Sequence, residues 1–189
     1  MARGGTPSPD VTTMSKPTAR MFGPFFAAIA RRLGGRAQAT RDSIGPAYLI
    51  DHLQPLLSVI TLADARRVIA AAERKAEDIG QPMNIAVVDA GGTLVAHVRM
   101  DDAWMGSVDI AIKKAWTSRA FDIETKALAK LAQPGEDFYG IHASNDGKVM
   151  IFAGGIPLKQ GGRVVGAVGV SGGAGKQDQE VAEAGAKAF

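Results

Sequence analysis

The stretch Asn84–Met100, which reads NIAVVDAGGTLVAHVRM, carries the clearest strand and turn signals of the chain. Valine and isoleucine before the turn favour a pleated backbone, and Gly91-Gly92 tolerates the positive φ of a tight hairpin turn. After the turn, successive side chains alternate between two faces. One face carries Leu94, Ala96, Val98 and Met100. The stretch therefore predicts a β-hairpin with one apolar face, which needs a cover because an isolated hairpin is marginal in water.

A second hairpin is predicted near the C-terminus. The sequence GGRVVGAV at 161–168 repeats the pattern of GGTLVAHV at 91–98, which supports a sheet built from two hairpins. Gly166 and Gly169 lie within the predicted strand and leave little side-chain bulk there. They predict that something packs closely on the sheet, either a helix, a second subunit or a flat ligand.

The remaining elements place helices around this sheet. Thr61 and Asp64 have the form of a capping box and begin a first helix, and Ser107 is expected to cap a second one at about 108–121. Further helices are predicted at 125–131 and from Asp178 onward, and further strands at 149–153, 156–158 and 163–171. The order predicts an α+β fold, with an antiparallel sheet of about five strands and helices packed on it.

Composition excludes several classes of protein. The chain of 189 residues contains no cysteine. This excludes disulfides, thiolate ligands of a metal or haem, and a cysteine nucleophile. No stretch reaches the roughly 20 apolar residues of a membrane span, so membrane insertion is not expected. Residues 1–60 hold seven Lys/Arg against three Asp/Glu, and the rest holds 15 against 16. The nearly neutral folded part predicts no nucleic-acid interface.

Residues 1–60 are predicted to be a tail, and residues 61–189 the folded domain. In the tail, the apolar run Met21–Ala30 follows two basic residues and precedes Ala37-Gln38-Ala39. This is the order of an export signal. Three arginines interrupt it, however, which is equally consistent with a basic tail. The chain is therefore expected to be secreted, with a cytoplasmic location as the alternative.

The loop at 133–148 holds the most suggestive chemistry. His142 lies there close to Phe138 and Tyr139. Apolar rings beside an imidazole suit a flat metal macrocycle, and the phenolate of Tyr139 is an alternative ligand of ferric haem. A purely structural loop histidine fits the sequence as well.

Four other residues are candidates for different chemistry. Glu180 and Glu183 lie on adjacent turns of the last predicted helix and could offer two carboxylates to a metal ion, although a solvated helix face explains them too. Asp89 at the hairpin turn and His97 on its second strand are the acid–base groups available to a small-molecule enzyme. An aspartate at a turn is also expected for backbone reasons.

Several segments together carry a family resemblance. They are NIAVVDAGGTLVAHVRMDDAW at 84–104, KKAWTSRAFD at 113–122, QPGEDFYGIHASNDGKVMIFAGGIPL at 133–158, VVGAVGVSGG at 164–173 and DQEVAEAGAKAF at 178–189. Through them the chain resembles the haem-binding and haem-degrading family, also called the glycolate-operon type, which is typified by the secreted haem-binding protein of streptomycetes. Residues 1–60 lie outside the resemblance.

The resemblance implies a PAS- or profilin-like fold, a homo-oligomer (an octamer in the type member), and binding of haem and iron, with a corrinoid in some relatives. It also implies an accessory role in redox and haem sensing beside a membrane sensor kinase, with slow haem degradation as its enzymatic side. By the same resemblance, Thr117 belongs to the haem site and His142 to tetrapyrrole binding.

The resulting expectation is a tetrapyrrole-binding protein whose catalytic residues are unknown, and the alternative is a small-molecule enzyme of the same fold. Haem is expected between the loop at 133–148 and the helix at 113–119, near a subunit boundary. That helix offers the ring and the propionates Lys113, Lys114, Trp116, Thr117 and Arg119. His142 is the expected axial ligand, with His97 and Tyr139 as alternatives.

Overall fold

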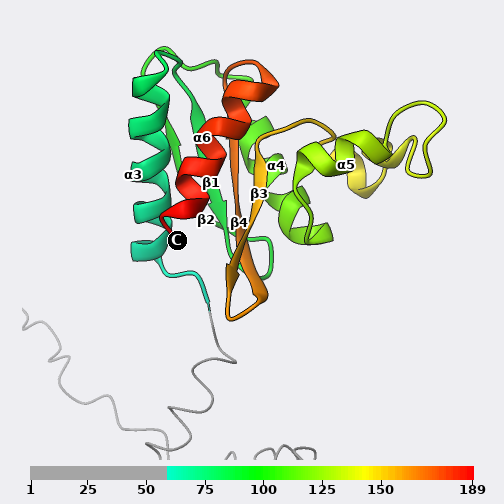
Figure 1. Ribbon diagram of the computed structural model, residues 1–189, viewed down its shortest axis with the longest axis horizontal. Coiled ribbons are helices and arrows are strands. Elements are labelled where there is room, and N and C mark those ends of the chain that lie inside the picture. The colour runs from blue at the N-terminus through cyan, green and yellow to red at the C-terminus, as the bar shows by residue number, and fades with distance from the viewer. Residues whose placement is uncertain (1–58) are drawn as a thin grey trace, which may run out of the picture. The chain divides into compact units, whose positions relative to one another are not determined.

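The computed structural model describes residues 59–189, and the predicted export signal lies outside them. The described residues form a four-stranded antiparallel sheet in the order β2-β1-β4-β3, with helices on both faces (Figure 1). The strands are β1 (Asn84–Val88), β2 (Leu94–Arg99), β3 (Gly155–Gln160) and β4 (Arg163–Ser171). The helices are α3 (Leu62–Asp78), α4 (Ser107–Phe121), α5 (Thr125–Leu131) and α6 (Gly175–Lys187), with short 3-10 turns η2 (Ile141–Ala143) and η3 (Asn145–Gly147). The predicted α+β class is confirmed.

Both predicted hairpins are present. β1 pairs with β2, β3 pairs with β4, and the central pair β1–β4 joins the two hairpins into one sheet. Gly92 has φ +76°, and Gly161 and Gly162 have φ +56° and +79°, so each turn uses the positive φ that only glycine adopts cheaply.

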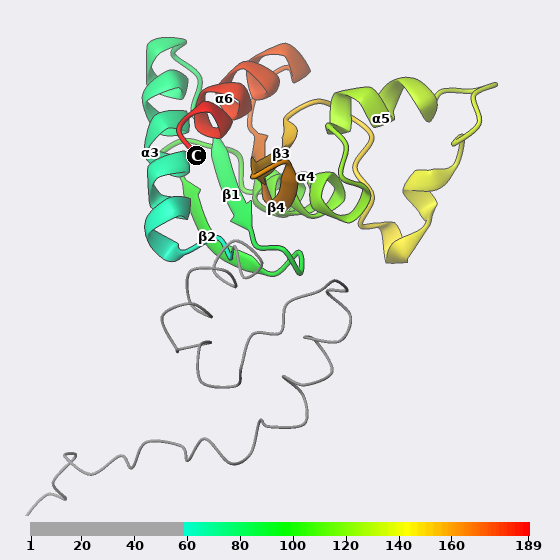
Figure 2. The same cartoon turned by 60° about the horizontal axis from the view of Figure 1, so that its bottom comes forward.

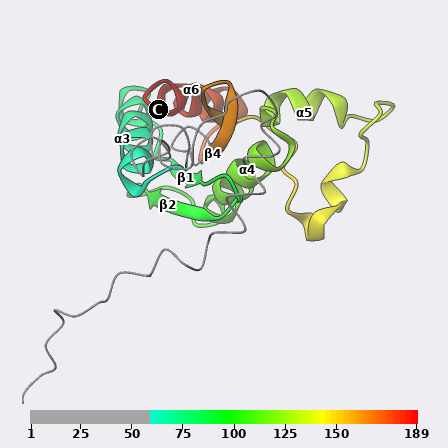
Figure 3. The same cartoon turned by 90° about the horizontal axis from the view of Figure 1, so that it is seen from below.

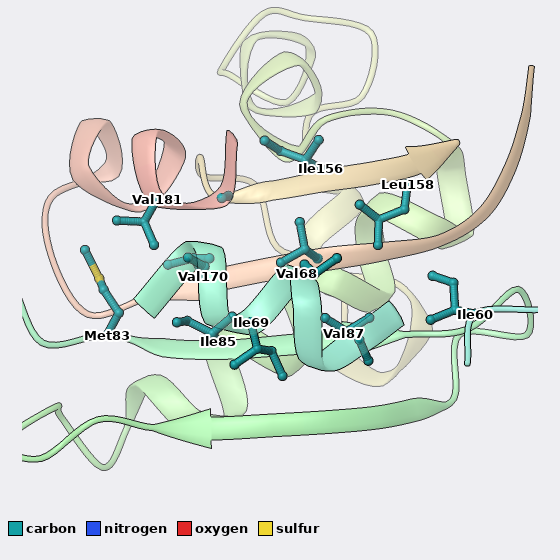
Figure 4. Packing of buried hydrophobic residues seen from close by; sticks show 14 of the residues in the cluster. Ile60, Val68, Ile69, Met83, Ile85, Val87, Ile156, Leu158, Val170 and Val181 are labelled. Atoms are coloured by element: carbon teal, nitrogen blue, oxygen red, sulfur yellow. The ribbon is translucent and has the colours of Figure 1, made fainter. Parts of the chain in front are cut away.

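One face of the sheet packs against α3 and α6 (Figures 2 and 4). The predicted capping box begins α3, because Thr61 Oγ1 accepts a hydrogen bond from Asp64 N and Asp64 Oδ2 accepts one from Thr61 N. Small residues on α3 then allow close packing on the sheet. The larger members of this core are Ile60, Val68, Ile69, Met83, Ile85, Val87, Ile156, Leu158, Val165, Val168, Val170 and Val181.

The other face packs against α4 (Figure 3), through side chains that are mostly alanines. A Cβ atom on Gly169 would lie 2.1 Å from Ala111 O and 2.4 Å from Ala115 N. Of the three occupants expected over this glycine, the structure therefore places a helix there.

Three local predictions are wrong. The sheet of the described residues has four strands rather than about five, because 149–153 forms no strand: side chains, not a neighbouring strand, accept from the N–H groups of Met150 and Gly154. Among the described residues Gly106, not Ser107, is the N-cap of α4, and no side chain caps it. Helix α6 begins at Gly175, ahead of Asp178, whose carboxylate accepts from the backbone before the helix.

The segment 125–150, here called the arm, extends from the end of α4 away from the rest of the domain (Figure 2). It contains α5, η2 and η3. Its buried apolar side chains are Leu128, Ala132 and Val149, so few apolar contacts hold it. No helix within residues 59–189 is long and apolar enough to cross a membrane.

Candidate functional site

Thr117 fixes the point where the arm returns to the body. Its side chain is fully buried on α4. The hydroxyl accepts a hydrogen bond from Met150 N at 2.9 Å and donates one to Lys148 O at 3.2 Å. Both bonds go to the backbone of the returning segment, so the Thr117 hydroxyl is not available to a ligand. Thr117 affects ligand binding only by positioning that segment.

A Thr117→Val variant is therefore expected to lose about 1–3 kcal/mol of unfolding free energy, because valine keeps the shape but leaves the amide of Met150 without its acceptor. Chemical denaturation measures this loss. Thr117→Ser is the control, since it retains the hydroxyl. Equal stability of the valine and serine variants would contradict the anchoring role.

The arm presents its predicted site residues to solvent. Phe138 and Tyr139 are 46% and 65% exposed, and His142 is exposed on η2. Within residues 59–189 the imidazole of His142 makes no hydrogen bond to another side chain or to the backbone. The structure thus brings two apolar rings and one uncommitted imidazole onto the same projecting segment.

The neighbouring face of α4 combines an aromatic ring with positive charge. Trp116 packs against the first hairpin, where a Cβ on Gly92 would lie 3.0 Å from its Cδ1. Lys148 Nζ lies 5.7 Å from the centroid of the Trp116 ring. Lys113 and Arg119 lie on the same helix, and each pairs with an aspartate on or just after it. This face offers an apolar plane bordered by cations.

His97 lies apart from the arm, on the sheet face that packs against α4. It sits opposite Ala86 in the β1–β2 pairing. Burial lowers its pKa from the ordinary value, because the charged imidazolium would lose solvation. Its Nε2 atom is buried and has no hydrogen-bond partner within residues 59–189. Burial thus favours the neutral form of the His97 imidazole, and its buried Nε2 atom is uncommitted.

Asp89 is committed to the turn. Its Oδ1 accepts from Gly91 N at 2.8 Å and from Thr93 N at 2.9 Å. Two backbone bonds to one carboxylate oxygen brace the hairpin turn, which is the backbone role that the sequence also allows.

Glu180 and Glu183 both line a hollow of about 370 Å³ beside α6, but lysines engage them. Glu180 Oε1 lies 2.6 Å from Lys75 Nζ, and Glu183 Oε1 lies 3.2 Å from Lys126 Nζ. The part of the chain that the structure describes holds no group of three or more His, Cys, Asp or Glu side chains suited to a metal ion. The metal site suggested at these two residues stays a prediction.

Lys114, which was predicted to face the haem, instead lies in a buried ion pair that sequence reasoning missed. Lys114 on α4 is fully buried, and its Nζ lies 2.6 Å from Asp178 Oδ2 and 2.9 Å from Val170 O. Burial lowers the pKa of Lys114, and the carboxylate of Asp178 opposes that shift. The available signal was the position of Lys114 between Ala111 and Ala115 on the apolar side of the helix.

Known proteins match the described domain. Residues 60–187 match the model of a family described as haem degrading protein HbpS-like. An uncharacterized 15.0 kDa protein of Citrobacter freundii, from the dhaT-dhaS intergenic region, is 42% identical over 127 residues, which cover 67% of this chain and 89% of that protein. Protein GlcG of Escherichia coli strain K12 is 35% identical over 107 residues, covering 57% of this chain and 77% of GlcG.

The corrinoid adenosyltransferase PduO of Citrobacter freundii is 38% identical over 130 residues, which cover 69% of this chain but only 38% of PduO. Two solved structures share the fold. A crystal structure of a PduOC–haem complex has a TM-score of 0.67 at 35% identity and covers 69% of this chain and 94% of that one. A double mutant of Streptomyces reticuli HbpS has a TM-score of 0.62 at 28% identity, covering 82% and 93%.

Proposed function

The chain belongs to the HbpS-like family, and on that premise we propose that it binds haem between the arm and the neighbouring face of α4. The family resemblance predicted from the sequence is confirmed. The observation that carries the proposal is the structure of a relative of the same fold in complex with haem.

The residues of the proposed site fit a haem group. Haem needs an axial donor and apolar surface for its ring, and its two propionates need cations or hydrogen-bond donors. The uncommitted imidazole of His142 supplies the first, and the exposed rings of Phe138 and Tyr139 supply the second. Lys148, whose Nζ lies over the Trp116 ring, would supply positive charge for the propionates, and Lys113, on the same helix as Trp116, would do so on leaving Asp109.

His142 is the proposed axial ligand. Its side chain is accessible, and no hydrogen bond within residues 59–189 has to break before it binds iron. His97 and Tyr139 remain the alternatives. Thr117 acts by holding the returning segment rather than by touching the ring. When bound, haem would supply the redox and ligand-binding chemistry of its iron.

A His142→Ala variant is expected to shift the Soret band of the hemin complex and to weaken hemin binding at least about tenfold. Loss of a residue that only orients a metal ligand typically lowers affinity by about tenfold or more, and loss of the iron ligand itself is expected to cost at least as much. Absorbance titration of the intact chain measures both effects. Tyr139→Phe and His97→Ala, titrated in parallel, report on the two alternatives.

An unchanged spectrum and affinity for His142→Ala, together with loss of both in His97→Ala, would move the ligand to β2. Hemin binding that no variant changes would mean nonspecific adsorption on an apolar surface.

We also propose that the chain forms a homo-oligomer larger than a dimer, with the octamer that the resemblance implies as the expected state. The support is the arm, which projects from the domain and would place the haem contacted by Phe138 and Tyr139 near a subunit boundary. Analytical ultracentrifugation at micromolar concentration is expected to show this assembly, and a monomer there would contradict the proposal.

The finer roles are proposals that rest on the family. They are iron and corrinoid binding, slow haem degradation, partnership with a membrane sensor kinase in redox sensing, and a secreted location. The support for corrinoid binding is the name of PduO alone, because the match spans little more than a third of the length of PduO. The alternative of a small-molecule enzyme keeps His97 as its acid–base group, while Asp89 is occupied by the turn.

A further inference from the structure

Phe152 is an exposed aromatic ring at the foot of the arm, in the segment where the predicted strand does not form. Its side chain is 45% exposed. The backbone on both sides is fixed by side chains of the helices: Thr117 holds Met150 N, and Gln179 Oε1 accepts from Gly154 N at 3.2 Å. An exposed ring on a segment anchored at both ends is preorganised, so that binding a ligand orders little more of the chain.

One face of the Phe152 ring is occupied by a cation. Lys114 Nζ lies 4.9 Å from the ring centroid. The ammonium group has three N–H donors, of which two point to Val170 O and Asp178 Oδ2, and the ring takes the remaining side. The ion pair is fully buried, so water does not screen this cation–π contact.

The absence of a side chain at Gly154 keeps this arrangement possible. A Cβ at Gly154 would lie 2.9 Å from Asp178 Cβ and 3.1 Å from Lys114 Nζ. Gly154 also has φ +114°, a conformation that other residues rarely adopt. The ammonium of Lys114 therefore lies close to both the Phe152 ring and Gly154.

We propose that Phe152 is a stacking platform for the tetrapyrrole ring, with Lys114 on the inner face of its ring and the exposed part of the side chain toward the ligand. This inference rests on the proposed haem binding and adds a contact from the segment that returns from the arm. The ammonium draws the π electrons of the ring toward its inner face. The outer face is then less negative and stacks better on the electron-rich macrocycle.

The experiment compares hemin with metal-free protoporphyrin IX, which stacks but has no iron to coordinate. Phe152→Leu keeps the apolar bulk and removes the aromatic face. This variant is expected to bind both porphyrins about fivefold more weakly. Absorbance measures the affinity for hemin, and fluorescence measures the affinity for protoporphyrin IX. Phe152→Tyr keeps the ring and should stay within about twofold of the wild type. Trp104→Leu is the control, because Trp104 is an exposed ring before α4, at the end far from the arm.

The outcomes separate the two proposals. If the wild-type chain binds both porphyrins and Phe152→Leu binds them equally well, the stacking platform is wrong while haem binding stands. If Phe152→Leu lowers the affinity for hemin but not for protoporphyrin IX, Phe152 acts on the iron ligand, and the proposed stacking role is again wrong. If the wild-type chain binds neither porphyrin, the proposed function and the platform are both overturned.

Discussion

A Lys114→Met variant is expected to lose about 3–5 kcal/mol of unfolding free energy, because it leaves Asp178 buried without its counter-ion. The carboxylate of Asp178 is 2.6 Å from the lysine ammonium, and its other oxygen accepts from Gly172 N and Gly173 N. The pair thus joins α4 to the turn before α6. Chemical denaturation of the purified domain measures the loss.

Two further variants test the cause of this loss. Lys113→Met is the matched control, since Lys113 pairs with Asp109 at the surface and such pairs contribute about 0–1 kcal/mol. Adding Asp178→Asn to Lys114→Met removes the isolated charge and is expected to recover part of the stability. A Lys114→Met variant as stable as Lys113→Met would show that the buried pair contributes nothing.

Gly169→Ala is expected to destabilise the domain by about 3 kcal/mol, at the upper end for an overpacked core. The added methyl group would lie 2.1 Å from Ala111 O and 2.4 Å from Ala115 N. Both are backbone atoms of α4, so no flexible side chain can give way, and the helix itself must move off the sheet.

Gly106→Ala provides the control for this substitution. A Cβ at Gly106 would meet nothing within 4 Å, and its φ of −63° suits alanine. The Gly106→Ala variant should unfold at nearly the same temperature as the wild type. If Gly169→Ala unfolded at the same temperature as Gly106→Ala, the close packing of α4 on β4 would be refuted.

The features predicted from the sequence are those that depend on nearby residues. The Gly-Gly turns and the alternation after them determine both hairpins, and the capping box at Thr61 begins α3 as predicted. Helix α5 has the predicted bounds, Thr125–Leu131. Each of these signals acts within a few residues of the chain, so no knowledge of the tertiary structure was needed.

The failures depend on residues far apart in the chain. The segment 149–153 has strand-forming residues, but Thr117 binds the amide of Met150 from 33 positions away. Lys114 resembles a surface lysine in its helix until Asp178, 64 positions later, explains its burial. Of the candidate site, the arm residues were predicted, whereas the supporting pair and the ring of Phe152 were visible only in the folded chain.

Titration of the intact wild-type chain with hemin tests whether the protein binds haem beside the arm. A distinct Soret band is expected to grow with added hemin and to saturate at one haem per chain, because each chain carries one arm and one neighbouring α4 face. A spectrum that stays that of free hemin, or absorbance that rises without saturation, would contradict haem binding at this site.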